Sequence, residues 1–304
     1  MLTIVTSACR GTGAKVLSLE LALHATAENG STSLLIDLSH EPFNDFDMET
    51  NCLSALLLNK ISVAEAYYNY RGSTSLLITR LLSSECLRHL GKSTLPHMRE
   101  DVIELLIHYI SRNIDFGHNV IVYVPLDYIT IKILTKMFVN PFLKKYLSVV
   151  VVANEKKHCI NTATIQMLQK VGGINFVKGV IFNRIPMGLV DTIRDEILRS
   201  NVLTPFIRNK NSFISLILPL TRQLYYRDLF GYVPLLMKAK DNDHARTIST
   251  AMRKLLRVVS EEEKEKLLIG VIRGMLNVVQ LREPTLFNRE AEALNRMLAE
   301  VPWE

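Results

Sequence analysis

Near its N-terminus the chain reads Cys9-Arg10-Gly11-Thr12-Gly13-Ala14-Lys15-Val16. This segment follows the apolar run Leu2–Val5 and opens a helical pattern that continues to Ala27, so it joins a predicted strand to the start of a helix. Backbone N–H groups and the helix dipole converge at such a junction and favour a bound anion. We therefore expect a phosphate-binding loop here.

The loop departs from the standard phosphate-loop pattern G-x-x-x-x-G-K-[ST]. Cys9 and Ala14 replace the two glycines, and Val16 replaces the hydroxyl residue that would hold Mg²⁺. Lys15 keeps the position of the phosphate-binding lysine. The sequence thus predicts an anion site that has lost some of its usual residues.

Short apolar runs alternate with helical patterns along most of the chain. Continuous apolar runs such as Val149–Val152 suit the middle of a parallel sheet that helices cover on both faces. We predict an α/β fold with a doubly wound, mainly parallel sheet flanked by helices. The predicted strands are 3–7, 32–38, 75–79, 119–124, 148–153, 176–182 and 213–218, and the predicted helices are 14–27, 53–58, 62–69, 98–114, 129–139, 160–171 and 189–200.

Beyond residue 241 the pattern contains helices alone. Asp241-Asn242-Asp243 predicts the cap of a helix that ends near Val259. A second helix, 264–280, carries a broad apolar face, and a short helix follows over 288–300. We expect 258–304 to form a helical extension packed on the main domain or on a dimer partner, because so apolar a face needs a covering surface.

Charge, hydropathy and cysteine spacing further limit the functional classes to which the protein could belong. The net charge of +6 is compatible with DNA or an anionic lipid surface but does not require either. No apolar run reaches the roughly 18 residues of a membrane span, and no secretory leader pattern is present, so we expect a cytoplasmic protein. The four cysteines lie far apart, which predicts reduced thiols and no zinc site: Cys9, Cys52, Cys86 and Cys159.

Residues 1–257 resemble the MinD/ParA family of deviant Walker A P-loop ATPases in the order of their motifs. The family loop K-G-G-x-G-K-[ST] aligns with Arg10–Val16. The resemblance implies that Lys15 binds phosphate and that Arg10 reaches the phosphates of a dimer partner. Val16 aligns with the magnesium ligand but has no oxygen to offer.

Two further carboxylates of that family are missing here. The segment Leu35-Ile36-Asp37-Leu38-Ser39 resembles the family's D-x-D motif, in which Asp37 matches the first carboxylate and Ser39 replaces the second. Serine is a poor base at neutral pH. Tyr123 stands where the family's V-I-V-D-x-P motif has the aspartate that supports Mg²⁺. We predict no metal site and no confident catalytic residue, with Asp37 as the one weak candidate.

The later motifs also match in order. Val180-Ile181-Phe182-Asn183-Arg184 resembles the family strand ending in N-[KR], and Asn183 is implied to read the adenine edge. The next two segments of the family resemble Leu218-Pro219-Leu220 and 231–235 of this chain. The predicted nucleotide- and phosphate-binding residues are therefore Arg10, Gly11, Thr12, Gly13, Ala14, Lys15, Val16 and Asn183.

These features predict a MinD/ParA-like protein with a degenerate nucleotide site. We expect a dimeric scaffold that positions, partitions or assembles a cellular cargo with a protein partner. We expect it to bind ATP or ADP largely independently of Mg²⁺ and to hydrolyse ATP slowly or not at all. One alternative is an active ATPase in which Asp37 or Asp127 replaces the metal ligands. The others are a DNA-binding partition accessory and, less favoured, membrane contact through 264–280.

Overall fold

The computed structural model describes residues 1–7, 11–29, 31–39, 52–70, 75–81, 100–126, 128–154, 165–199, 214–219, 227–228, 231–232, 234 and 243–256. Helix α11 (Asp243–Leu256) begins within the predicted cap. The helices expected over 264–280 and 288–300, and the extension 258–304 to which they belong, lie outside the described residues.

An eight-stranded sheet runs through the molecule in the order β3-β4-β2-β5-β1-β6-β7-β8. All neighbouring pairs are parallel except β3 with β4, which is antiparallel. The strands are β1 (Leu2–Ser7), β2 (Ser33–Asp37), β3 (Tyr68–Asn69), β4 (Leu76–Arg80), β5 (Asn119–Pro125), β6 (Leu147–Ala153), β7 (Val177–Ile185) and β8 (Ile214–Pro219). The seven predicted strands and the mainly parallel sheet are confirmed.

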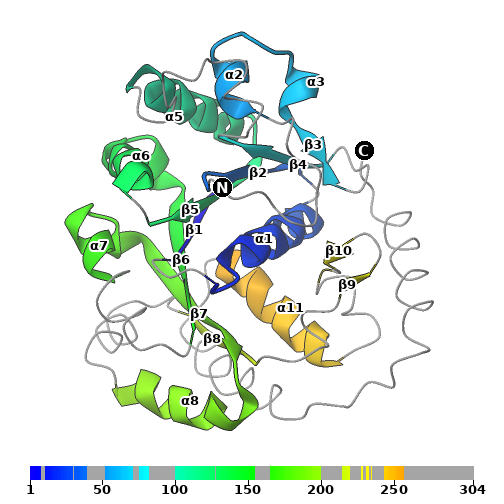
Figure 1. Ribbon diagram of the computed structural model, residues 1–304, viewed down its shortest axis with the longest axis vertical. Helices are drawn as coiled ribbons and strands as arrows, with labels where there is room; N and C mark the ends of the chain where they lie inside the picture. Colours follow the sequence, from blue (N-terminus) through cyan, green and yellow to red (C-terminus); the bar gives the residue numbers. More distant parts are fainter. Residues whose placement is uncertain are drawn as a thin grey trace.

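Helices lie on both faces of this sheet. The chain forms α1 (Ala14–Asn29), α2 (Leu53–Leu57), α3 (Val63–Ala66), α5 (Glu100–Asp115), α6 (Tyr128–Val139), α7 (Ile165–Lys170) and α8 (Val190–Arg199). Figure 1 shows α5, α6 and α7 along one face and α1 with α11 along the other. Covered on both sides, the strand residues Val149–Val152 are fully buried, as their uninterrupted apolar run predicts.

The helix predicted over 62–69 is wrong in its second half. Helix α3 ends at Ala66, and Tyr68–Asn69 form the edge strand β3 against β4. Aromatic residues favour extended backbone, and pairing with β4 supplies hydrogen bonds that a short isolated helix would lack. The hydroxyl of Thr79 reinforces this turn by donating to the carbonyl of Ala66 at 2.7 Å.

Three smaller features complete the fold. Cys52 is buried and disulfide-bonded, so the expectation of reduced thiols is wrong at this position; the cysteine that pairs with it lies outside the described residues. Strand β9 (Arg227–Asp228) pairs antiparallel with β10 (Gly231–Tyr232). Among the described residues, no helix is both long enough and apolar enough to cross a membrane.

The topology brings the polar ends of three strands together. Strand β1 lies between β5 and β6, while β2 and β4 lie beyond β5. The register aligns Asp37 of β2 with Tyr123 of β5 on one side and with Arg80 of β4 on the other. Ligands of open α/β sheets bind at these carboxyl ends, so this edge is where the loop after β1 should function.

Candidate functional site

The loop after β1 has the backbone of a tight strand-to-helix junction. Gly11 and Gly13 have φ of +75° and +76°, in the left-handed region that residues other than glycine rarely adopt. The amide of Leu17 donates to the carbonyl of Gly13 at 3.0 Å, so helical hydrogen bonding begins directly after the loop. The N-terminus of α1 therefore faces this edge of the sheet. Arg10, predicted to reach a partner's phosphates, lies outside the described residues.

Strand β7 holds the loop from the other side. The amide nitrogen of Asn183 donates to the carbonyl of Thr12 at 2.6 Å, and Arg184 Nη1 donates to the carbonyl of Gly11 at 3.3 Å. A Cβ atom on Gly13 would lie only 2.4 Å from Asn183 Nδ2. Asn183 is fully buried and fixes the loop backbone. Its reading of an adenine edge stays a prediction.

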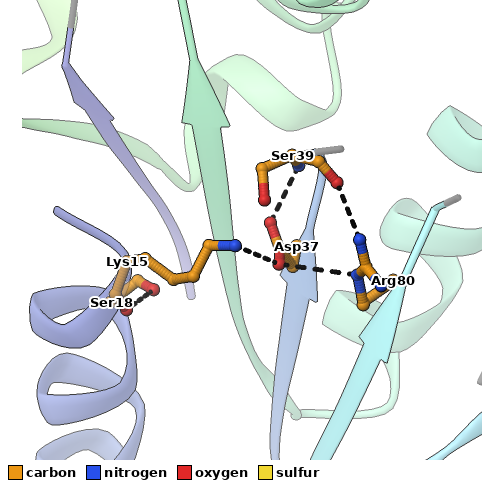
Figure 2. Close-up of polar contacts among 5 residues, drawn as sticks. All are labelled: Lys15, Ser18, Asp37, Ser39 and Arg80. Carbon is orange, nitrogen blue, oxygen red and sulfur yellow. Dashed lines mark hydrogen bonds and ion pairs between the residues drawn. The ribbon is translucent and has the colours of Figure 1, made fainter. Parts of the chain in front are cut away.

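A buried carboxylate forms the centre of the site. Asp37 is fully buried, and its Oδ2 lies 3.1 Å from Lys15 Nζ and 3.8 Å from Arg80 Nε. Its Oδ1 accepts the backbone N–H of Ser39 at 2.8 Å. Figure 2 shows Lys15 and Arg80 approaching this carboxylate from opposite sides. A buried carboxylate needs such partners, because its desolvation is costly unless ion pairs and hydrogen bonds offset it.

Of the two cations beside Asp37, Lys15 is the one that a ligand could reach. Its side chain is 18% exposed, whereas that of Arg80 is 3% exposed. Lys15 lies in the first turn of α1, where Ser18 Oγ donates to the carbonyl of Lys15 at 2.5 Å (Figure 2). The ammonium group also lies 5.7 Å from the ring centroid of Tyr123. The lysine is thus placed between the loop, the carboxylate of Asp37 and an aromatic ring.

The predicted residues at metal-binding positions offer little to a metal ion. Val16 is half-buried against the core, and Tyr123 presents its ring to Lys15. Ser39 is buried and accepts from Arg80 Nη2 through its carbonyl at 3.4 Å. Within the described residues, no group of three or more His, Cys, Asp or Glu side chains is arranged to hold a metal ion. Asp127 is outside that part of the chain.

Sequence reasoning placed Lys15 and Asp37 on the same edge but missed their ion pair and missed Arg80. The signal for Arg80 is a charged residue that directly follows the apolar run 76–78 and Thr79. A charge at the carboxyl end of a buried strand points to the site edge of a parallel sheet. Of the remaining predicted residues, Thr12 and Ala14 are buried and Gly11 is exposed.

Comparisons with known proteins bear on the fold. No protein-family model matches the sequence, and no curated protein matches it. Solved structures do match. A chain of the MinC:MinD cell division protein complex from Aquifex aeolicus is similar with a TM-score of 0.53 and 16% identity, over 93% of this chain and 98% of that chain.

Plasmid partition proteins are similar as well. One from Borrelia burgdorferi matches with a TM-score of 0.51 and 12% identity over 84% of this chain and 96% of its own. A putative one from the same organism, bound to AMPPNP, matches with a TM-score of 0.50 and 12% identity over 84% of this chain and 97% of its own. The chain therefore has the fold of P-loop ATPases. Its fold is similar to that of MinD and of plasmid partition proteins, in agreement with the resemblance that the sequence motifs indicate.

Proposed function

We propose that this chain is a MinD/ParA-like scaffold protein with a degenerate nucleotide site. Lys15 and the loop Gly11, Thr12, Gly13 and Ala14, with Val16 at the start of the helix, would bind the phosphates of ATP or ADP. Arg10 and Asn183 would complete the site. Bound nucleotide would control assembly on a cargo, and hydrolysis would be very slow or absent.

One observation carries this proposal: the two cations around Asp37. A carboxylate that coordinates Mg²⁺ needs an open face toward the ion, and hard cations such as Mg²⁺ require oxygen ligands in octahedral geometry. Here Asp37 lies between Lys15 and Arg80. Val16 and Tyr123 align with the family positions of the magnesium ligand and of the aspartate that supports Mg²⁺. These residues do not fit a magnesium site.

The remaining parts of the site support binding of an anion. Lys15 supplies a positive charge, and the α1 N-terminus supplies backbone amides and the positive end of the helix dipole. Asn183 and Arg184 hold the loop in shape before any ligand arrives. A site of this kind binds phosphate by charge and amide hydrogen bonds rather than through a metal.

The dimer and the protein partner are part of the same proposal. One structural neighbour comes from a MinC:MinD complex, so that neighbour assembles with another protein. For this chain, sedimentation velocity with and without ADP would test self-association. We expect a nucleotide-dependent change in mass, and a monomer under both conditions would contradict this part of the proposal.

Calorimetric titration with ADP and ATP, each with Mg²⁺ and with EDTA, tests the nucleotide site. We expect binding that does not depend on Mg²⁺, together with negligible ATP turnover in a phosphate-release assay. Mg²⁺-dependent turnover that Lys15→Ala abolishes would establish the alternative, an active ATPase with substitute ligands. A salt-dependent shift of DNA mobility without nucleotide binding would favour the DNA-binding accessory instead.

A further inference from the structure

Arg80 is a buried cation that no motif assigned to the site. Its side chain is 3% exposed, its Nε lies 3.8 Å from Asp37 Oδ2, and its Nη2 donates to the carbonyl of Ser39 at 3.4 Å. Parallel pairing of β4 with β2 places Arg80 beside Asp37 in register. Arginine suits this position because its guanidinium stays charged and can serve two oxygen acceptors at once.

The carboxylate of Asp37 is shared between two cations that differ in freedom. Arg80 projects from a strand and is nearly sealed from water, whereas Lys15 is partly exposed at the start of α1. Figure 2 shows them on opposite sides of Asp37. A ligand anion arriving at the loop would therefore meet Lys15 and leave the Asp37–Arg80 pair in place.

Charge balance explains why the second cation matters. When Lys15 transfers to a phosphate, Asp37 loses one counter-charge while a negative ligand arrives nearby. An unpaired buried carboxylate beside an anion would oppose binding, because both desolvation and like-charge repulsion are unfavourable. With Arg80 in place, the carboxylate remains neutralised. No metal ion is then required to screen it.

We propose that Arg80 is a positioning residue that keeps Asp37 paired and neutralised. A nucleotide phosphate can then replace Asp37 as the partner of Lys15 without a metal ion. This inference rests on the proposed function, since it concerns ligands of the Lys15 site. It gives Asp37 two tasks: it holds Lys15 when no anion is present, and it competes with the anion for that lysine. Arg80 sets how strongly it competes.

Titration with ADP in EDTA separates these tasks. Asp37→Asn removes the competitor for Lys15, and we expect ADP to bind about tenfold more tightly. Arg80→Gln removes one of the two cations beside Asp37, so the carboxylate should hold Lys15 more strongly, and we expect ADP binding about tenfold weaker. Arg80→Lys, which keeps the charge, should restore most of the loss. Combining Asp37→Asn with Arg80→Gln should recover the tight binding of Asp37→Asn alone.

A matched control removes an equal charge elsewhere. Arg112 is exposed near the end of α5, which leads into the amino end of β5 on the opposite edge of the sheet. Arg112→Gln should bind ADP like the unmodified chain. Equal affinities of Arg80→Gln and Arg112→Gln, with ADP bound by the unmodified chain, would overturn the role of Arg80 and leave the proposed function standing.

Two further outcomes keep the inference decidable. If neither the unmodified chain nor Asp37→Asn binds ADP, the proposed function itself fails. If circular dichroism shows that Arg80→Gln does not fold, the comparison of Asp37→Asn with the unmodified chain decides. Tighter binding by Asp37→Asn supports the exchange, and equal or weaker binding overturns it.

Discussion

Asn183 Nδ2 donates a hydrogen bond of 2.6 Å to the carbonyl of Thr12, which joins the end of β7 to the loop after β1 across 171 residues of sequence. Both residues are buried, so the bond is shielded from water. It holds the loop in the conformation that the two left-handed glycines allow. The shape of the candidate site thus depends on β7 as much as on the loop itself.

Asn183→Ala should lower the free energy of unfolding by about 1–3 kcal/mol, because it leaves a buried carbonyl without this donor. Urea denaturation would measure the change. Arg184→Ala is the matched control: its bond to Gly11 is solvent-exposed and longer, at 3.3 Å. We expect less than about 1 kcal/mol from the control. An equal loss in both variants would contradict the importance of the buried bond.

Gly13→Ala should destabilise the chain more than Gly11→Ala. Both glycines have left-handed φ, which costs a residue with a Cβ atom about 1–2 kcal/mol. At Gly13 the added Cβ would also lie 2.4 Å from Asn183 Nδ2, whereas at Gly11 nothing lies within 4 Å. Overpacking of this kind costs about 1–3 kcal/mol more. Thermal unfolding of the two variants side by side would check this, and identical melting temperatures would refute it.

Much of this architecture could be predicted because a continuous apolar run is stable only where both of its faces are buried. The run Val149–Val152 needs cover on both faces, which a parallel sheet between helices provides. The edge strand β3 has only two residues and depends on β4 for its hydrogen bonds, so local sequence cannot reveal it. Its residues satisfy a helical pattern equally well.

The contents of the site were harder to predict than its place. Lys15 and Asp37 were each assigned from motifs, but their ion pair depends on how α1 sits over β2. Arg80 reaches Asp37 only because β4 pairs with β2, a contact between residues 43 positions apart that the sheet order decides. Local patterns carry no information about such neighbours.

Lys15→Ala should weaken ADP binding in EDTA by about 1.5–3 kcal/mol, the range for hydrogen bonds to charged groups. Isothermal titration calorimetry would measure it. Lys144→Ala is a suitable control, because Lys144 is exposed and precedes β6 at the opposite edge of the sheet. If both variants bind as the unmodified chain does, the loop is a structural turn rather than a phosphate site.

A buried histidine joins α1 to α11 and makes stability depend on pH. His24 is fully buried; its Nδ1 donates to the carbonyl of Glu20 at 2.6 Å, and its Nε2 accepts from Ser249 Oγ at 2.8 Å. The pKa of His24 is lowered from 6.5 to about 4, mainly because the side chain is buried; the hydrogen bond to the Glu20 carbonyl acts in the opposite direction, and the charge of Arg253 contributes to the lowering. The native state therefore holds His24 neutral.

The sign of the effect follows from proton binding. Below its ordinary pKa of 6.5 the histidine takes up a proton in the unfolded chain but not in the folded one until the pH nears 4. Stability is therefore complete above that ordinary value and declines as the pH falls toward the folded pKa, by up to about 3 kcal/mol. Urea denaturation at about pH 7 and about pH 4.5 would measure the decline.

His24→Gln is the variant that isolates this contribution, because it keeps Glu20, Ser249 and Arg253 around a side chain that does not titrate. Its stability at neutral pH should be lower, since the two hydrogen bonds of His24 are replaced imperfectly. Between about pH 7 and about pH 4.5, however, it should lose about 2–3 kcal/mol less than the unmodified chain. Parallel declines in the two proteins would show that other groups cause the acid sensitivity and that His24 does not link the α1–α11 contact to pH.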